Sequence, residues 1–191
     1  MQVLDKQIEF LNEYNTQRSR EKAVDEAINA SIRRNKYIIE PIDPRLKAYF
    51  KTLWGKILEE KARALYSEID EQTYCEIIEQ VKKTLNDNAA PNLKIKISHA
   101  QKSLSVYIKH LWCFDSESSS GRPKIKPVHC PVDSVVLGLI GWRGRPWTQV
   151  DSIKEHLEHI YAIREWAGAT TSLSEWEVIN FEKGLRRRTG R

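Results

Sequence analysis

The sequence has few cysteines and no long apolar run, and both absences limit what the protein can be. Its three cysteines, Cys75, Cys113 and Cys130, cannot all pair, and their spacing is not that of a disulfide scaffold. We therefore expect a reducing, cytoplasmic environment. No apolar stretch approaches the roughly 20 residues that cross a bilayer, so no membrane partner is expected. The N-terminal ten residues lack the apolar core of a signal peptide.

Several catalytic signatures are also missing. The sequence contains no P-loop, no dinucleotide-binding fingerprint and no serine nucleophile elbow. Three cysteines are too few for a four-cysteine iron–sulfur cluster. We expect no cofactor.

The composition fits one globular domain with a basic surface. The 191 residues are 40% hydrophobic and include six tryptophans, enough for a real core. One mainly helical domain over 1–191 is expected, made of two lobes with 1–90 and 91–191 as their approximate bounds. The net charge of +5 indicates an anionic partner, although an ordinary basic protein would carry the same charge.

Apolar residues recur mostly at helical spacing. The pattern predicts a mainly α fold of about seven or eight helices. A stripe at Tyr74, Ile77, Ile78, Val81 and Leu85 is the clearest, and Asp70 is its expected N-cap. Segments outside the predicted helices are a connection over 35–43, an extended lead-in over 93–97 and a loop over 115–130.

Two chemically suggestive residues lie between Ile97 and Gly141. A helix is expected to open near Ser98 with Lys102 in its first turn, where helix N–H groups can hold a phosphate. After the loop, Pro131-Val132-Asp133 opens a second helix over 134–140. The simplest role for Asp133 is to cap that helix, and a lysine on a surface needs no special role.

The same segments resemble those of helix–hairpin–helix DNA glycosylases. Ile97 to Leu104 matches the hairpin and the lysine that follows it, and Pro131 to Leu137 matches the Pro-Val-Asp segment. The resemblance implies a lysine nucleophile at Lys102 and a catalytic carboxylate at Asp133, acting on a nucleotide flipped out of DNA. It also implies hairpin contacts to DNA from Ser98, His99 and Ala100, although Ser98 and Ala100 stand where the family has glycines.

Further DNA contacts are expected from the loop between Trp142 and Trp147. Arg143 and Arg145 would contact phosphates, and Trp142 would stack on a base. The alternative is a loop that its tryptophans fix to the core. Trp112 and Tyr107 are further stacking candidates, with a core role favoured for Trp112. A terminal run, Arg186 to Arg188, adds a basic patch or a solvated end.

Histidines and cysteines around the loop offer an alternative metal site. His110, Cys113, His129 and Cys130 are zinc ligand types at nearly suitable spacing. The competing interpretation, which we favour, is buried cysteines and edge histidines without a metal. His156 and His159 are interpreted as part of a solvated helix face.

Together these features favour a DNA-binding protein, specifically a base-excision DNA glycosylase or lyase. One alternative is a non-catalytic helical protein that binds nucleic acid. Another is a protein–protein interaction module, for instance a phage- or defence-related factor, with tryptophans at its interface.

Overall fold

A computed structural model describes residues 3–32, 43–89, 93–118, 125–168 and 171–189. Over these ranges the protein is mainly α-helical and has no strand, which confirms the predicted fold class. The described elements are eight α-helices and two short 3-10 helices: α1 (Val3–Tyr14), α2 (Arg20–Ile32), α3 (Pro44–Ala62), η2 (Arg63–Tyr66), α4 (Glu71–Asp87), α5 (Ile97–Glu117), α6 (Ser134–Leu139), η3 (Trp147–Gln149), α7 (Ile153–Ala167) and α8 (Leu173–Thr189).

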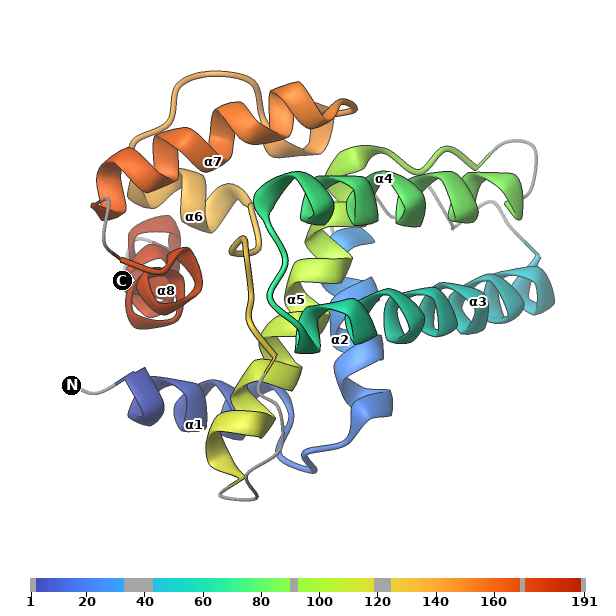
Figure 1. Ribbon diagram of the computed structural model, residues 1–191, viewed down its shortest axis with the longest axis horizontal. Helices are drawn as coiled ribbons and strands as arrows, with labels where there is room; N and C mark the ends of the chain where they lie inside the picture. The colour runs from blue at the N-terminus through green and yellow to red at the C-terminus, as the bar shows by residue number, and fades with distance from the viewer. Residues whose placement is uncertain (1–2, 33–42, 90–92, 119–124, 169–170, 190–191) are drawn as a thin grey trace.

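Helix α5 lies in the middle of the molecule. Helices α2, α3 and α4 lie on one side of it, and α6, α7 and α8 lie on the other (Figure 1). Helix α5 is buried from Ile97 to Leu111, including polar residues such as Lys102 and Lys109. A helix buried on all sides must satisfy its polar side chains inside the protein, and these side chains form the site described below.

Capping residues define where several helices begin. Asp43 accepts hydrogen bonds from the backbone N–H groups of Arg45 and Leu46, and Pro44 follows it as the first residue of α3. Asp70 caps α4 through the N–H of Thr73, as expected. The apolar stripe of α4 is buried as predicted. These caps satisfy N–H groups that a helix leaves unpaired at its start.

The apolar interior forms two clusters. The larger contains buried side chains of α2, α3, α4 and α5. The smaller is formed by Cys130, Val132 and side chains of α6, η3, α7 and α8. Helix α5 contributes most of its apolar side chains to the larger cluster.

Two local predictions were wrong. Helix α5 continues to Glu117, beyond the loop start expected at residue 115. On α7 the inward residues are His156, His159, Ile160 and Ile163, whereas Tyr161 is 52% exposed. The inward stripe runs at i, i+3, i+4 and i+7, so a residue one position after Ile160 points about 100° away from it. The two histidines are therefore buried and do not form a solvated face.

Some predictions fall outside the described residues. These are the connection over 35–43 except Asp43, the polar part of the loop at 119–124, and the side chains of Arg186, Arg187 and Arg188. Residues 93–96 are described and extended, as the favoured interpretation of that segment predicted.

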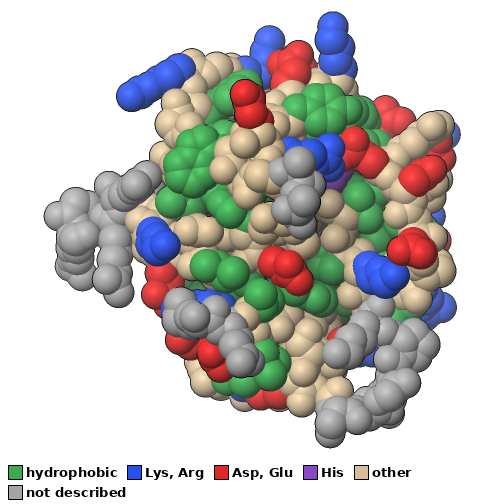
Figure 2. All heavy atoms as spheres, turned by 60° about the vertical axis from the view of Figure 1, so that its left-hand side comes forward, with side chains coloured by type: hydrophobic (Ala, Val, Ile, Leu, Met, Phe, Trp, Pro, Cys, Tyr) green, Lys and Arg blue, Asp and Glu red, His purple; other side chains and the backbone are tan. Residues whose placement is uncertain are grey.

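The surface in Figure 2 carries acidic, basic and apolar side chains interspersed with one another. The net positive charge is thus not gathered into one area of that face. None of the described helices has the length and apolar character needed to cross a bilayer.

Candidate functional site

The structure brings Lys102 and Asp133 together. Lys102 Nζ lies 2.7 Å from Asp133 Oδ2, and the side chains are 7% and 14% exposed. Lys102 is in the second turn of α5, not the first, because the helix already begins at Ile97. Asp133 precedes α6. An ion pair removed from water to this degree is costly to form unless its geometry is good, so the contact is a specific feature of the fold.

Asp133 has two roles at once. Its Oδ1 accepts hydrogen bonds from the backbone N–H groups of Val135 (2.7 Å) and Val136 (3.0 Å), which is the cap expected from the sequence. Its Oδ2 accepts a hydrogen bond from the Lys102 ammonium. Burial alone would raise the pKa of Asp133, but the Lys102 ammonium and the two N–H groups outweigh burial and lower it. The carboxylate is therefore ionised and fixed in direction.

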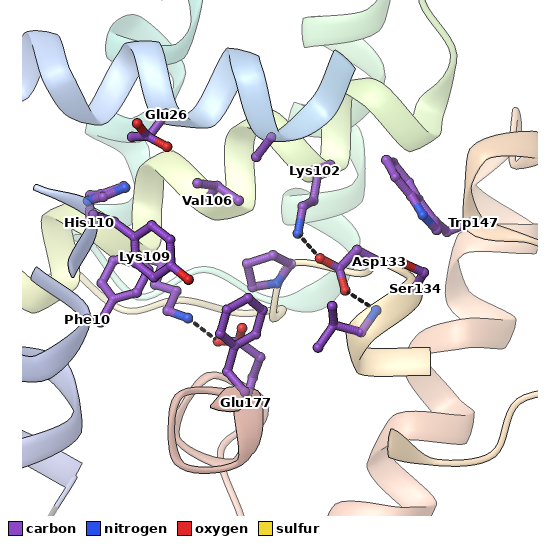
Figure 3. A pocket seen from close by; sticks show the side chains of 15 residues that line it. Phe10, Glu26, Lys102, Val106, Lys109, His110, Asp133, Ser134, Trp147 and Glu177 are labelled. Atoms are coloured by element: carbon purple, nitrogen blue, oxygen red, sulfur yellow. Dashed lines mark hydrogen bonds and ion pairs between the residues drawn. The ribbon is translucent and has the colours of Figure 1, made fainter. Parts of the chain in front are cut away.

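A cavity of about 150 Å³ opens beside this pair, between α1, α2, α5, α6 and α8 (Figure 3). Lys102 and Asp133 lie at one end of it, together with Trp147. Its lining mixes charged and aromatic side chains: Phe10, Tyr14, Glu26, Ala30, Lys102, Val106, Lys109, His110, Pro131, Asp133, Ser134, Val135, Trp147, Glu177 and Phe181. Such a mixture of apolar walls and a few polar groups is typical of sites that bind small molecules or parts of larger ones.

A second buried ion pair lines the other end of the cavity. Lys109 Nζ lies 2.6 Å from Glu177 Oε2, and the side chains are 5% and 2% exposed. The Lys109 ammonium also lies 4.2 Å from the ring centroid of Phe10 and 4.9 Å from that of Phe181. Both are cation–π distances. The cavity therefore has a lysine–carboxylate pair at each end.

His110 lines the same end and has no partner for either ring nitrogen within the described parts of the chain. It is 1% exposed and packs against Phe10, with the ring centroids 4.8 Å apart. Burial lowers the pKa of His110 to about 3, with a further contribution from Lys109. The ring is therefore neutral, with one N–H donor and one nitrogen acceptor.

Ser98, His99 and Ala100 do not occupy the surface position that the resemblance implied. All three are buried within α5. The N–H of Ser98 donates to the carbonyl of Val150 at 3.1 Å, and His99 Nδ1 accepts from the N–H of Lys96 at 3.1 Å. A phosphate cannot reach groups that are buried and engaged in this way, and Ile97 to Leu104 are helical throughout.

The loop from Trp142 to Trp147 is fixed at both ends. Trp142 Nε1 donates to the carbonyl of Arg145 at 3.0 Å, and the Trp142 ring packs edge-on against His159. Trp147 is buried beside the cavity. Arg145 pairs with Glu155 at 3.1 Å, while Arg143 is exposed. The loop fits the interpretation in which tryptophans fix it to the core, and Arg143 stays available to an anionic partner.

The four residues of the alternative zinc set do not converge. Within the described residues, no group of three or more His, Cys, Asp or Glu side chains is placed to hold a metal ion. His129 is engaged elsewhere: its Nε2 lies 3.0 Å from Glu71 and its Nδ1 lies 3.1 Å from His156. Hydrogen bonding to His129 and to Arg164 lowers the pKa of Glu71 to about 2. The histidines therefore connect α4 to α7 as a polar network.

Sequence reasoning missed most of the cavity. A signal for Lys109 was present, because it follows Lys102 by seven residues and so lies on the same face of α5 two turns later. Glu177 and Phe10 come from helices at opposite ends of the chain, and their positions next to Lys109 follow from tertiary packing alone.

Comparison of the chain with models of protein families, with curated proteins and with solved structures found no match. The site therefore has to be interpreted from its own geometry.

Proposed function

We propose that the protein is a base-excision DNA glycosylase with lyase activity, and that Lys102 and Asp133 are its reacting pair. The observation that supports this most is the contact between Lys102 and Asp133 on a cavity wall, although 31 residues separate them in the sequence. Both residues were singled out by the resemblance to helix–hairpin–helix glycosylases. The cavity gives the reaction a site sheltered from water, and the net charge of +5 favours an anionic polymer.

In the proposed reaction, Lys102 first gives one proton to Asp133 and becomes a neutral amine. Nζ attacks C1′ of the flipped nucleotide while the bond from C1′ to the base breaks, and its electron pair leaves with the base. The departing base takes the proton from Asp133. A proton then moves from Nζ to O4′ as the sugar ring opens, which leaves a protonated imine between Lys102 and C1′.

The Lys109–Glu177 pair, at the end of the cavity away from Lys102, suggests which base enters it. The Glu177 carboxylate can accept from two neighbouring N–H donors, and the Lys109 ammonium beside it can donate to a carbonyl. Guanine carries this arrangement along its Watson–Crick edge, with two N–H donors next to O6, and enzymes read flipped bases by that edge. An enzyme that removed every guanine would destroy DNA, so the substrate proposed is a modified guanine such as 8-oxoguanine.

Borohydride trapping tests the proposed chemistry. The wild-type protein is expected to form a covalent complex with a duplex that contains one abasic site, because borohydride reduces the imine to a stable amine. No complex is expected with an undamaged duplex or without borohydride. A wild-type protein that traps no abasic DNA would refute the lyase activity. Salt should weaken the non-covalent complex with DNA steeply, because the proposed binding includes contacts to phosphates.

The substitution Asp133→Asn is expected to separate catalysis from capping. Asparagine still caps α6 through its carbonyl oxygen, because Asn and Asp cap about equally well. It cannot accept the proton of Lys102, so single-turnover base release should fall by roughly 100-fold or more. The matched control is Asp70→Asn, since Asp70 also caps a helix but lies outside the cavity lining. Equal activity in both variants would remove Asp133 from the mechanism.

A further inference from the structure

His110 is unusual among the side chains that line the cavity. Two of them carry buried polar atoms without a partner in the described residues, His110 and Trp147. The Trp147 indole N–H can only donate, and it lies at the Lys102 end (Figure 3). His110 lies at the Lys109 end and can donate through one nitrogen and accept through the other. A buried polar group without a partner destabilises the folded protein, which suggests that a ligand supplies the missing partner.

We propose that His110 is a substrate-positioning residue that hydrogen-bonds the flipped base along the edge next to the one that Lys109 and Glu177 contact. This inference rests on the proposed function. The Lys109–Glu177 pair matches an edge that ordinary guanine and 8-oxoguanine share, so it does not distinguish them. The two bases differ along the adjoining edge, which begins at O6, next to the position that Lys109 would contact: guanine has an acceptor at N7, whereas 8-oxoguanine has an N–H donor there and a carbonyl at C8. A neutral imidazole can accept from N7–H or donate to the C8 oxygen of 8-oxoguanine, and it can donate to N7 of guanine, so either base would give one of the unpaired His110 nitrogens a partner.

The charged side chains that line the cavity already have partners. Lys102 is paired with Asp133, and Lys109 with Glu177. Glu26 accepts a hydrogen bond from Lys22 at 2.8 Å. Among the described residues, Glu26 is the only acidic residue of α2 that lines the cavity. It makes no hydrogen bond to His110. His110 is therefore the lining side chain best placed to form a new hydrogen bond with a base that enters the cavity.

The test compares His110→Phe with the wild type on two duplexes, one with a single 8-oxoguanine and one with an abasic site. The variant is expected to release 8-oxoguanine at least about tenfold more slowly. It should trap the abasic duplex within about twofold of wild type, because an abasic site has no base for His110 to contact. His110→Asn, which keeps a donor and an acceptor, should recover part of the lost rate.

The folding of the variant provides a second readout. Phenylalanine places an apolar ring where an unpaired polar ring stood, so the melting temperature should stay equal or rise. If the larger ring lowers it, His110→Leu replaces His110→Phe in both assays.

Each remaining outcome has a separate meaning. Equal losses on both duplexes would show a general role in folding or DNA binding, and no loss on either would show that His110 does not contact the base; both overturn the inference. A wild-type protein that traps abasic DNA but releases no 8-oxoguanine overturns it too, while leaving the lyase chemistry in place. A wild-type protein inactive on both duplexes refutes the proposed function itself.

Discussion

Replacing Lys102 with glutamine is expected to abolish the borohydride-trapped complex while leaving the protein folded. Glutamine keeps most of the length of lysine and can still donate a hydrogen bond to Asp133, but it has no amine to form an imine. Asp133 retains its two backbone donors, so its charge is not left wholly unpaired. We expect a loss of about 1–3 kcal/mol in the free energy of unfolding and no trapped product above background.

The controls for this result use two other lysines. Lys154 is exposed on α7, and Lys154→Gln should trap abasic DNA as the wild type does. Lys109→Gln asks whether the second cavity lysine is the nucleophile. Trapping that survives in Lys102→Gln and disappears in Lys109→Gln would transfer the chemistry to Lys109 and contradict the assignment of Lys102.

Mild acid is expected to unfold the protein, because all five histidines are buried. Burial lowers the pKa of His99 to about 4 and that of His110 to about 3, and it also lowers those of His129, His156 and His159. In the unfolded chain each would titrate near about 6.5. The unfolded state therefore binds more protons below about pH 6.5, and the folded state loses stability progressively as the pH falls.

The size of this effect follows from the lowered pKa values of His99 and His110. Between about pH 7.5 and pH 5, His99 and His110 each contribute a loss of about 2 kcal/mol, and the other three histidines act in the same direction. Domains of this kind are stable by about 5–15 kcal/mol, so much of the stability should be gone by pH 5. Glu71, with a pKa lowered to about 2, contributes a further loss only below about pH 4.5.

Circular dichroism melts from about pH 8 to pH 4.5 would measure this dependence. The variant His110→Phe removes one titrating group and should move the acid transition to lower pH, whereas Lys154→Gln should not move it. A melting temperature that stays constant down to pH 4.5 would contradict the expectation.

Much of the helical fold could be predicted from the sequence, because local signals determine it. Asp43, Asp70 and Asp133 each precede a helix that they cap, and the stripe of α4 has regular spacing. Lys102 and Asp133 were found through a resemblance of two short segments. The structure adds that the two side chains meet.

The rest of the site depends on packing that no local pattern records. Lys109 is one of many lysines until α8 places Glu177 beside it and α1 supplies Phe10. His156 and His159 looked like part of a charged face because glutamates precede them, yet their position on the stripe of Ile160 and Ile163 buries them. The chemical types of the neighbouring residues therefore indicated the buried face of α7 less well than the i, i+3, i+4, i+7 spacing did.

The placement of Lys102 and Lys109 on one uninterrupted helix has an evolutionary consequence. Seven residues of helix separate their backbones by about 10 Å, and no hinge between elements can change that distance. A cavity that adapts to bases of other sizes or shapes must therefore change on its opposite walls. We expect homologous proteins with different substrates to vary at Phe10 of α1 and at Glu177 and Phe181 of α8, while the two lysines of α5 keep their separation.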